Sequence, residues 1–513
     1  MVGVSSMGTA LLAIDQGTTG TTTLVMDARG TTLGRATVEL PQHYPQPGWV
    51  EHDADEIWES VVESIGRGLA EARIRGEDIA AIGIANQRET VLLWERHSGR
   101  PVGRAVVWQD RRTAGRCEEL IQAGHSAEVR RVTGLVIDPY FSATKVRWLL
   151  DSDPPLRQRA NSGELAFGTV DSFLVHRLAG GAPAAAPHVT DATNASRTLL
   201  MDLRRREWDD AMCRLFGVPK AVLPRIVASA GVVAKTRNVP ALPDGIPIAG
   251  LAGDQHAALF GQACFEPGQA KCTYGTGAFV LVNTGDAPMY SRSGLLSTVA
   301  WQIGDRVTFA LEGSCFVAGA AVQWLRDGLG IVKNAGEIEQ LARRVPDSDG
   351  VVFVPALAGL GAPHWDPEAR GLVAGLTRRS SAAHLARATL EAIAFQVNDL
   401  LAAMKGDLGA PISRLRVDGG AAANDLLLEL QSDLSAVSVE RPEELETTAR
   451  GAAMLAGVGA GFFAGGADAA RMISIDRTFM PRMGDDERRT HHLRWSDAVE
   501  RARTRSQNQR GLR

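Results

Sequence analysis

Two aspartates in this 513-residue chain stand where an apolar stretch meets small or polar residues. Asp15 ends an apolar run and is followed by Gln-Gly-Thr-Thr, and Asp254 lies between Gly253 and Gln255. Phosphoryl transfer uses carboxylates in two roles: one holds Mg²⁺, directly or through water, and another accepts the proton of the attacking hydroxyl. Turn or helix-cap aspartates are the alternative, because Asp is common in both places.

The elements that would position these carboxylates include one kind of turn that occurs twice. Residues 10–27 and 271–284 each read as an apolar strand, a short Gly/Thr turn and a second apolar strand. Glycine permits a sharp bend, and backbone N–H groups and Thr hydroxyls are the donors that a phosphate needs. Two such hairpins could hold one polyphosphate from opposite sides, which suggests a cleft enzyme that uses a nucleotide. Taken singly, each is equally an ordinary β-hairpin.

Two Gly-rich segments in the second half could line a nucleoside. In residues 417–425 Gly420 can bring backbone close to a flat ligand, and Asn424 offers an amide to a purine or ribose. In residues 312–325 small side chains beginning at Gly319 occur on a helical run and could form the floor under an adenosine. A tight turn before a helix and close core packing explain the same residues.

A polyol site is suggested by residues 86–90, Asn-Gln-Arg-Glu-Thr, which follow a buried-looking strand. Arg88 and Glu89 would provide donors and an acceptor for adjacent hydroxyl groups. Trp108 and Phe279 could cover the carbon atoms of a small ligand. The alternatives are a solvated surface ion pair for the first two residues and core positions for the aromatic ones.

Length and periodicity predict two α/β domains. A chain of this length with 45% hydrophobic residues exceeds what one core usually holds. Apolar runs at 79–87 and 105–110, expected as strands, alternate with amphipathic segments at 145–151 and 384–404, expected as helices. We place the domains at residues 8–256 and 257–500, with 501–513 as a flexible tail.

Charge and cysteine usage argue against several classes of protein. The net charge is −4 and Lys and Arg are mixed with Asp and Glu up to Arg501, so no nucleic-acid partner is expected. The five cysteines show no CxxC spacing, which argues against a disulfide framework or a zinc site and favours reduced thiols in the cytoplasm. No apolar run reaches 18 residues, so no membrane span is expected. The first apolar run leads into Asp15 and reads as a strand, not a signal peptide.

With these segments in view, the chain from about residue 11 to 499 resembles the FGGY family of carbohydrate kinases. Several of the matching segments are typical of the members that phosphorylate glycerol. The segments that carry the likeness include DQGTT at 15–19, NQRET at 86–90, VVWQDRRT at 106–113, TGLVIDPYFSATKVRWLL at 133–150, GDQHAALFGQ at 253–262, TYGTG at 273–277, GLGAPHWDPEARG at 359–371 and RVDGGAAAN at 416–424.

The resemblance implies an α/β fold of two actin-like (ribonuclease H-like) domains with a ligand cleft between them. It also implies ATP-dependent phosphorylation of glycerol to sn-glycerol 3-phosphate, with ATP and Mg²⁺ bound between the two Gly/Thr turns. Family members form dimers and tetramers, so a homo-oligomer is expected. The residues implied are Asp254 as general base; Asp15 for Mg²⁺; Arg88, Glu89, Tyr140, Asp254 and Gln255 for the glycerol hydroxyls; Trp108 and Phe279 for its carbons; Thr18, Thr19, Thr276 and Gly277 for the ATP phosphates; and Gly319, Gln323, Gly420 and Asn424 for adenosine.

One position departs from the family pattern. After DQGTT the family usually continues Ser-Ser-Arg or Ser-Thr-Arg, and that Arg faces the transferred phosphate, whereas Gly20-Thr21-Thr22 stands here. Loss of a cation near developing phosphate charge should slow transfer, since electrostatic stabilisation is the main contribution of the protein. Two alternatives stay open. An FGGY kinase for another small polyol or ketose is favoured if Trp108, Tyr140 and Phe279 line a larger pocket, and a weakly active actin-like nucleotide-binding regulator is motivated by Thr22.

Overall fold

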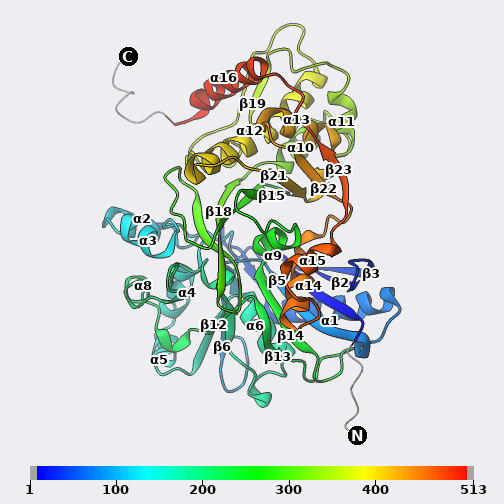
Figure 1. Ribbon diagram of the computed structural model, residues 1–513. Coiled ribbons are helices and arrows are strands. Elements are labelled where there is room, and N and C mark those ends of the chain that lie inside the picture. Colours follow the sequence, from blue (N-terminus) through cyan, green and yellow to red (C-terminus); the bar gives the residue numbers. More distant parts are fainter. Residues whose placement is uncertain (1–7, 505–513) are drawn as a thin grey trace.

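A computed structural model describes residues 8–504, and one long sheet runs through both lobes of the molecule (Figure 1). In spatial order its strands are β23 (Ile475–Phe479), β22 (Val439–Pro442), β21 (Arg414–Asp418), β15 (Gln269–Tyr274), β16 (Ala278–Gly285), β18 (Arg306–Cys315), β17 (Leu296–Ile303), β13 (Ala230–Lys235), β14 (Pro247–Gly253), β5 (Ile79–Asn86), β1 (Ala10–Gln16), β2 (Gly20–Asp27) and β3 (Thr32–Glu39).

The two halves of this sheet share one strand order. In the first half β3, β2 and β1 are antiparallel, and β5 and β14 continue parallel to β1. In the second half β18, β16 and β15 are antiparallel, and β21 and β22 continue parallel to β15. The halves join where β13 meets β17 at the single pair Ala230–Ile303. Both predicted hairpins are present, and the two halves are built on one plan.

Helices cover the faces of the sheet, and within residues 8–504 five short strand pairs lie outside it, four in the first half and one in the second. The helices are α1 (Ala54–Ala72), α2 (Ala114–Gln122), α3 (Ser126–Thr133), α4 (Ser142–Asp151), α5 (Pro154–Asn161), α6 (Val170–Leu178), α7 (Ala192–Ala195), α8 (Asp210–Phe216), α9 (Asp254–Gly261), α10 (Gly319–Asp327), α11 (Glu337–Ala342), α12 (Ala382–Leu408), α13 (Asp425–Ser435), α14 (Thr447–Gly459), α15 (Gly466–Ala469) and α16 (Asp485–Ala502). The short pairs are β4 (Glu51–His52) with β7 (Ala105–Val106), β6 (Leu92–Glu95) with β8 (Leu165–Gly168), β9 (Val189–Asp191) with β12 (Arg225–Val227), β10 (Met201–Asp202) with β11 (Glu207–Trp208), and β19 (Val352–Val354) with β20 (Leu372–Ala374).

Helix α14 ties the two halves together. It comes late in the sequence, yet it packs on β1, β5 and β14 of the first half and against α9 (Figure 1). Glycine makes this approach possible: a Cβ on Gly83 would collide with the carbonyl of Ala452, and one on Gly451 with the carbonyl of Ala257. Apolar side chains of both halves, among them Leu11 and Leu455, share one core.

Several local expectations can be compared with the structure. The helices expected at 145–151 and 384–404 lie within α4 and α12, and the strand at 79–87 is β5. The strand expected at 105–110 is wrong beyond Val106, because a turn closes there with the N–H of Asp110 donating to Val107 O (3.0 Å). The predicted domain boundary at 256/257 falls inside α9 and stays a prediction. Of the predicted tail, residues 501 and 502 belong to α16, and residues 505–513 lie outside the described part of the chain.

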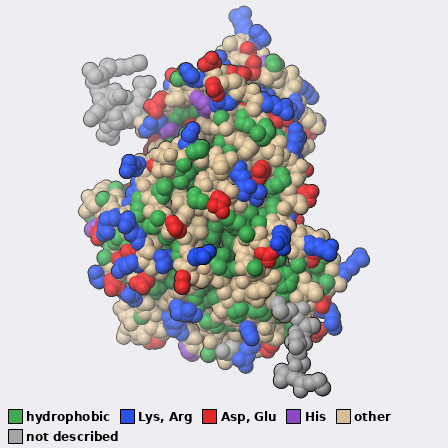
Figure 2. Space-filling model, in the orientation of Figure 1, with side chains coloured by type: hydrophobic (Ala, Val, Ile, Leu, Met, Phe, Trp, Pro, Cys, Tyr) green, Lys and Arg blue, Asp and Glu red, His purple; other side chains and the backbone are tan. Residues whose placement is uncertain are grey.

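The surface and the thiols agree with the composition. On the face in Figure 2, Lys and Arg are interspersed with Asp and Glu, as the sequence predicted. All five cysteines are buried free thiols. Between residues 8 and 504 the structure contains no helix long and apolar enough to span a membrane.

Candidate active site

The first Gly/Thr turn opens onto a pocket of about 530 Å³. The turn closes through a bond from Gly17 N to Gly20 O (2.9 Å), and Asp15 pairs with Thr22 across β1 and β2. Thr19 and Asp15 line the pocket, and Thr18 directs its hydroxyl toward Trp108, whose Nε1 donates to Thr18 Oγ1 (2.8 Å). The pocket lining is Asp15, Gly17, Thr19, Gly20, Thr22, Thr37, Glu39 and Leu40.

The second turn is built into the start of α10. The N–H of Gly319 donates to Gly275 O (3.0 Å), and the N–H of Ala320 donates to Thr276 O (3.0 Å). A Cβ on Gly277 would lie 2.5 Å from Cys315 O, so only glycine allows this packing. The structure thereby brings together Thr276, Gly277 and Gly319, which the sequence assigned to one nucleotide.

The remaining predicted adenosine residues occupy two elements near this turn. Gly419 packs against the backbone of Tyr274, so the loop after β21 lies beside the strand that enters the second turn. Gly420 is exposed, and a Cβ there would meet open space. Asn424 caps α13, because its Oδ1 accepts from Leu427 N (2.9 Å). This oxygen therefore stabilises the start of the helix, in line with the alternative of a tight turn before a helix. Gln323 is exposed on α10.

Arg88 is the centre of the predicted polyol cluster, and it is buried. Its Nε lies 3.0 Å from Asp254 Oδ1, its NH2 group donates to Tyr140 OH (3.3 Å), and its NH1 group donates to Glu312. The alternative of a solvated surface ion pair is therefore wrong for Arg88 and Glu89, which expose 3% and 1% of their surface.

Two charged residues of this cluster were not predicted, Glu312 of β18 and Arg197 after α7. Arg197 donates through Nε to Glu89 Oε1 (2.7 Å) and through NH2 to Glu312 Oε1 (2.8 Å). Burial opposes ionisation of Glu312, but the guanidinium groups of Arg197 and Arg88 lower its pKa to about 2. The signal in the sequence was a glutamate inside an apolar strand, which requires buried partners.

The other residues predicted to bind glycerol are held by contacts of several kinds. Glu89 has φ +62°, a strained conformation for a non-glycine residue, and Ser142 Oγ donates to its carbonyl (3.0 Å). Asp254 is the first residue of α9, and its Oδ1 accepts from Gln255 N (2.6 Å). The rings of Trp108 and Tyr140 meet edge to face at 5.6 Å. Phe279 is half-buried on β16.

Carboxylates gather around Asp15. Burial, together with the negative charges of Asp254, Glu446 and Asp418, raises the pKa of Asp15 well above its usual value. A divalent cation would offset this repulsion, so the residues present fit Mg²⁺. In residues 8–504 no three His, Cys, Asp or Glu side chains are grouped closely enough to hold a metal alone. Nucleotide oxygens would have to complete the coordination, as is usual for Mg²⁺.

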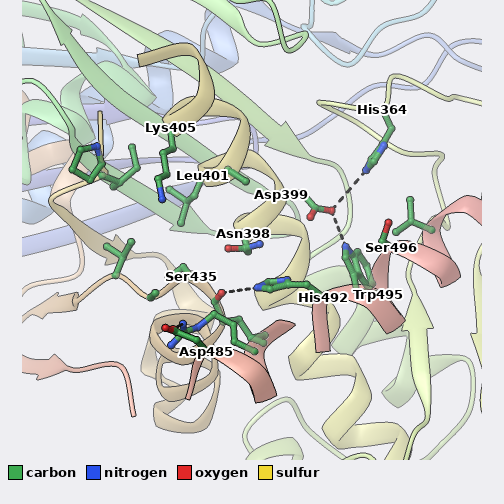
Figure 3. A pocket seen from close by; sticks show the side chains of 18 of the residues that line it. His364, Asn398, Asp399, Leu401, Lys405, Ser435, Asp485, His492, Trp495 and Ser496 are labelled. Atoms are coloured by element: carbon green, nitrogen blue, oxygen red, sulfur yellow. Dashed lines mark hydrogen bonds and ion pairs between the residues drawn. The ribbon is translucent and has the colours of Figure 1, made fainter. Parts of the chain in front are cut away.

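A second pocket, of about 710 Å³, lies between α12, α13 and α16 (Figure 3). Trp495 Nε1 donates to Asp399 Oδ2 (2.7 Å) on one side, and His492 Nε2 lies 2.9 Å from Leu434 O on the other. None of the site residues expected from the sequence lines this pocket.

Two α/β halves of one strand order, each with a Gly/Thr hairpin, define the class of actin-like kinases and ATPases. Comparison with known proteins makes the assignment specific. The model of the N-terminal domain of the FGGY family of carbohydrate kinases matches residues 10–261, and that of the C-terminal domain matches residues 270–460. The chain belongs to this family.

Curated relatives and solved structures extend the match to nearly the whole chain. The chain is similar to the glycerol kinases of Myxococcus xanthus (56% identity; 96% of this chain and 99% of the relative) and Aromatoleum aromaticum (55%; 96% and 98%). A crystal structure of Plasmodium falciparum glycerol kinase with ADP superposes with a TM-score of 0.90 at 34% identity (97% and 99%). A xylulose kinase from Lactobacillus acidophilus, at 21% identity and a TM-score of 0.85 (96% and 97%), shares the fold. The predicted fold and family are confirmed.

Proposed function

We propose that this protein transfers the γ-phosphoryl group of ATP to glycerol, producing sn-glycerol 3-phosphate and ADP. The observation that carries the proposal is the contact of Arg88 with both Asp254 and Tyr140, which gathers polyol-binding groups around one available carboxylate. The full-length similarity to glycerol kinases supports glycerol as the polyol.

Asp254 is the general base in this proposal. The oxygen of the terminal glycerol hydroxyl forms a bond to the γ-phosphorus while the bond from that phosphorus to the bridging oxygen of ADP breaks. The hydroxyl proton passes to the Asp254 carboxylate, and ADP carries away the electrons of the broken bond. Asp254 suits this role because its side chain keeps 30% of its surface exposed while Arg88 holds one of its oxygens.

The rest of the cluster binds and orients glycerol. Arg88 and Gln255 supply donors, Glu89 supplies an acceptor, and Tyr140 adds a hydroxyl. Trp108 and Phe279 cover the carbon atoms. Arg197 and Glu312 hold Glu89 and Arg88 through buried ion pairs, so that the binding groups are fixed before glycerol arrives.

The two turns hold ATP. Thr18, Thr19, Thr276 and Gly277 contact the phosphates, and Gly319, Gln323, Gly420 and Asn424 surround the nucleoside. Asp15 holds Mg²⁺, which when bound neutralises phosphate charge. A cytoplasmic location and a dimeric or tetrameric assembly belong to the same proposal.

A coupled assay of ADP release tests this function. ADP release should require glycerol and should disappear in Asp254→Asn. Erythritol, xylulose and dihydroxyacetone should be poorer substrates at equal concentration. A faster rate with one of them would assign another polyol or ketose, and no turnover in a folded sample that binds ATP would assign a nucleotide-binding regulator.

A further inference from the structure

Lys271 is a buried cation beside the proposed site with no role in the mechanism above. It lies on β15, which enters the second Gly/Thr turn, and its side chain is fully buried. The ammonium donates to Gln255 Oε1 and to Thr273 Oγ1 (2.8 Å). Burying an ammonium is costly unless its hydrogen bonds are satisfied, so these contacts constrain their partners strongly.

The contact with Gln255 determines which way its amide faces. An ammonium has three donors and no acceptor, so the Gln255 atom that meets it must be the carbonyl oxygen. The Nε2 group is then left for a ligand, and the described part of the chain gives Nε2 no hydrogen-bond partner. Gln255 follows the proposed base directly in α9, and its main-chain N–H donates to Asp254 Oδ1 (2.6 Å), so its side chain starts from the same turn as the proposed base.

We infer that Lys271 is a positioning residue that locks the Gln255 carboxamide, so that the polyol site presents an N–H donor next to the Asp254 carboxylate. The inference rests on the proposed function and deepens it. One hydroxyl of the polyol then accepts a hydrogen bond from Gln255, and another donates one to Asp254. Because the two hydroxyls meet different groups, the site binds the polyol in one orientation. Without Lys271 the Gln255 amide is free to rotate and to present its oxygen to the polyol. That oxygen repels the oxygen of the hydroxyl that accepts from Nε2 in the wild type, unless the hydroxyl reorients its O–H to donate.

Steady-state kinetics of Lys271→Met test the inference, because methionine keeps the length of the side chain and removes the ammonium. The expected result is a KM for glycerol raised about tenfold, the effect of one hydrogen bond, with the KM for ATP within about twofold of the wild type. Lys405→Met, on the exposed end of α12, is the matched control and should change neither constant. In a double-mutant cycle, Gln255→Leu should remove most of the effect of Lys271→Met.

Gln255→Glu provides a second variant for the case that Lys271→Met does not fold. The carboxylate keeps an acceptor for Lys271 and replaces the N–H donor by an acceptor, so the protein should fold while its KM for glycerol rises. An unchanged KM in Gln255→Glu would overturn the inference. The inference would also be overturned if the effects of Lys271→Met and Gln255→Leu were additive in the double-mutant cycle, or if the KM for ATP rose in place of the KM for glycerol. If the wild type shows no glycerol-dependent ADP release, the proposed function fails, whereas an active wild type with an unaffected Lys271→Met sinks the inference alone.

Discussion

Arg88 Nε lies 3.0 Å from Asp254 Oδ1, and this ion pair connects the loop after β5 to the first residue of α9. Arg88 is itself held by Glu312, which comes from a strand of the other half of the sheet. The proposed base is therefore positioned by charges from both halves of the chain. A substitution at Asp254 or at Glu312 should therefore lower the catalytic rate or the stability of the protein.

Asp254→Asn should lower kcat by about 10²- to 10⁴-fold, because the amide cannot accept the hydroxyl proton. ADP release in the presence of glycerol measures the loss. Calorimetric titration with ATP should give an affinity close to that of the wild type, since none of the proposed nucleotide contacts involves Asp254. Retention of more than a tenth of the wild-type kcat would show that another group takes the proton.

Glu312→Gln should destabilise the protein by about 3–5 kcal/mol, because it leaves the buried Arg88 and Arg197 without their shared counter-charge. Urea denaturation measures the change, with the exposed Glu118→Gln as control. A loss below about 1 kcal/mol would mean that Glu89 and Asp254 together balance both guanidinium groups.

Thr22→Arg should raise kcat with ATP and glycerol. Thr22 lines the pocket at the first turn, where its hydroxyl bonds that of Thr37 (2.9 Å), and among residues 8–504 no Lys or Arg lines this pocket. An added guanidinium would stabilise charge on the transferred phosphoryl group. Thr22→Gln is the control, because it lengthens the side chain without adding charge. A flat or lower rate in Thr22→Arg would indicate that a cation elsewhere already serves the phosphate.

Stability should fall as the pH drops from about 6.5 toward 4, in part through His52. Burial is the main cause that lowers the pKa of His52 from 6.5 to about 4, so in this window the unfolded chain binds a proton that the folded chain does not. The unfolding free energy then declines by about 1.4 kcal/mol per pH unit for this group.

Denaturation of His52→Gln at several pH values checks the contribution of His52. The variant should show a flatter slope over the same window. The exposed His97→Gln should keep the slope of the wild type, and an unchanged slope in His52→Gln would refute the assignment.

Sequence patterns predicted the parts of the fold and site that depend on local chemistry. The two hairpins follow from glycine and threonine between apolar strands, and α12 follows from its helical period. The contact of Arg88 with Glu312 did not follow, because the two residues are separated by 224 positions and only the completed sheet brings them together. The orientation of Gln255 likewise depends on Lys271, whose burial no local pattern reveals. The strand predicted at 105–110 is too long because the turn at Asp110 depends on contacts distant in the sequence. One of these is the hydrogen bond that Val50 N donates to the Asp110 carboxylate (2.7 Å).

The glycine contact between Gly451 of α14 and Ala257 of α9 has a mechanical consequence. Backbone meets backbone there, so no flexible side chain can absorb a displacement. Asp254 is three residues before Ala257 on the same helix, so the proposed proton acceptor belongs to an element whose position this backbone contact sets. Any side chain added at Gly451 would therefore push α9 away from α14 and displace Asp254 with it.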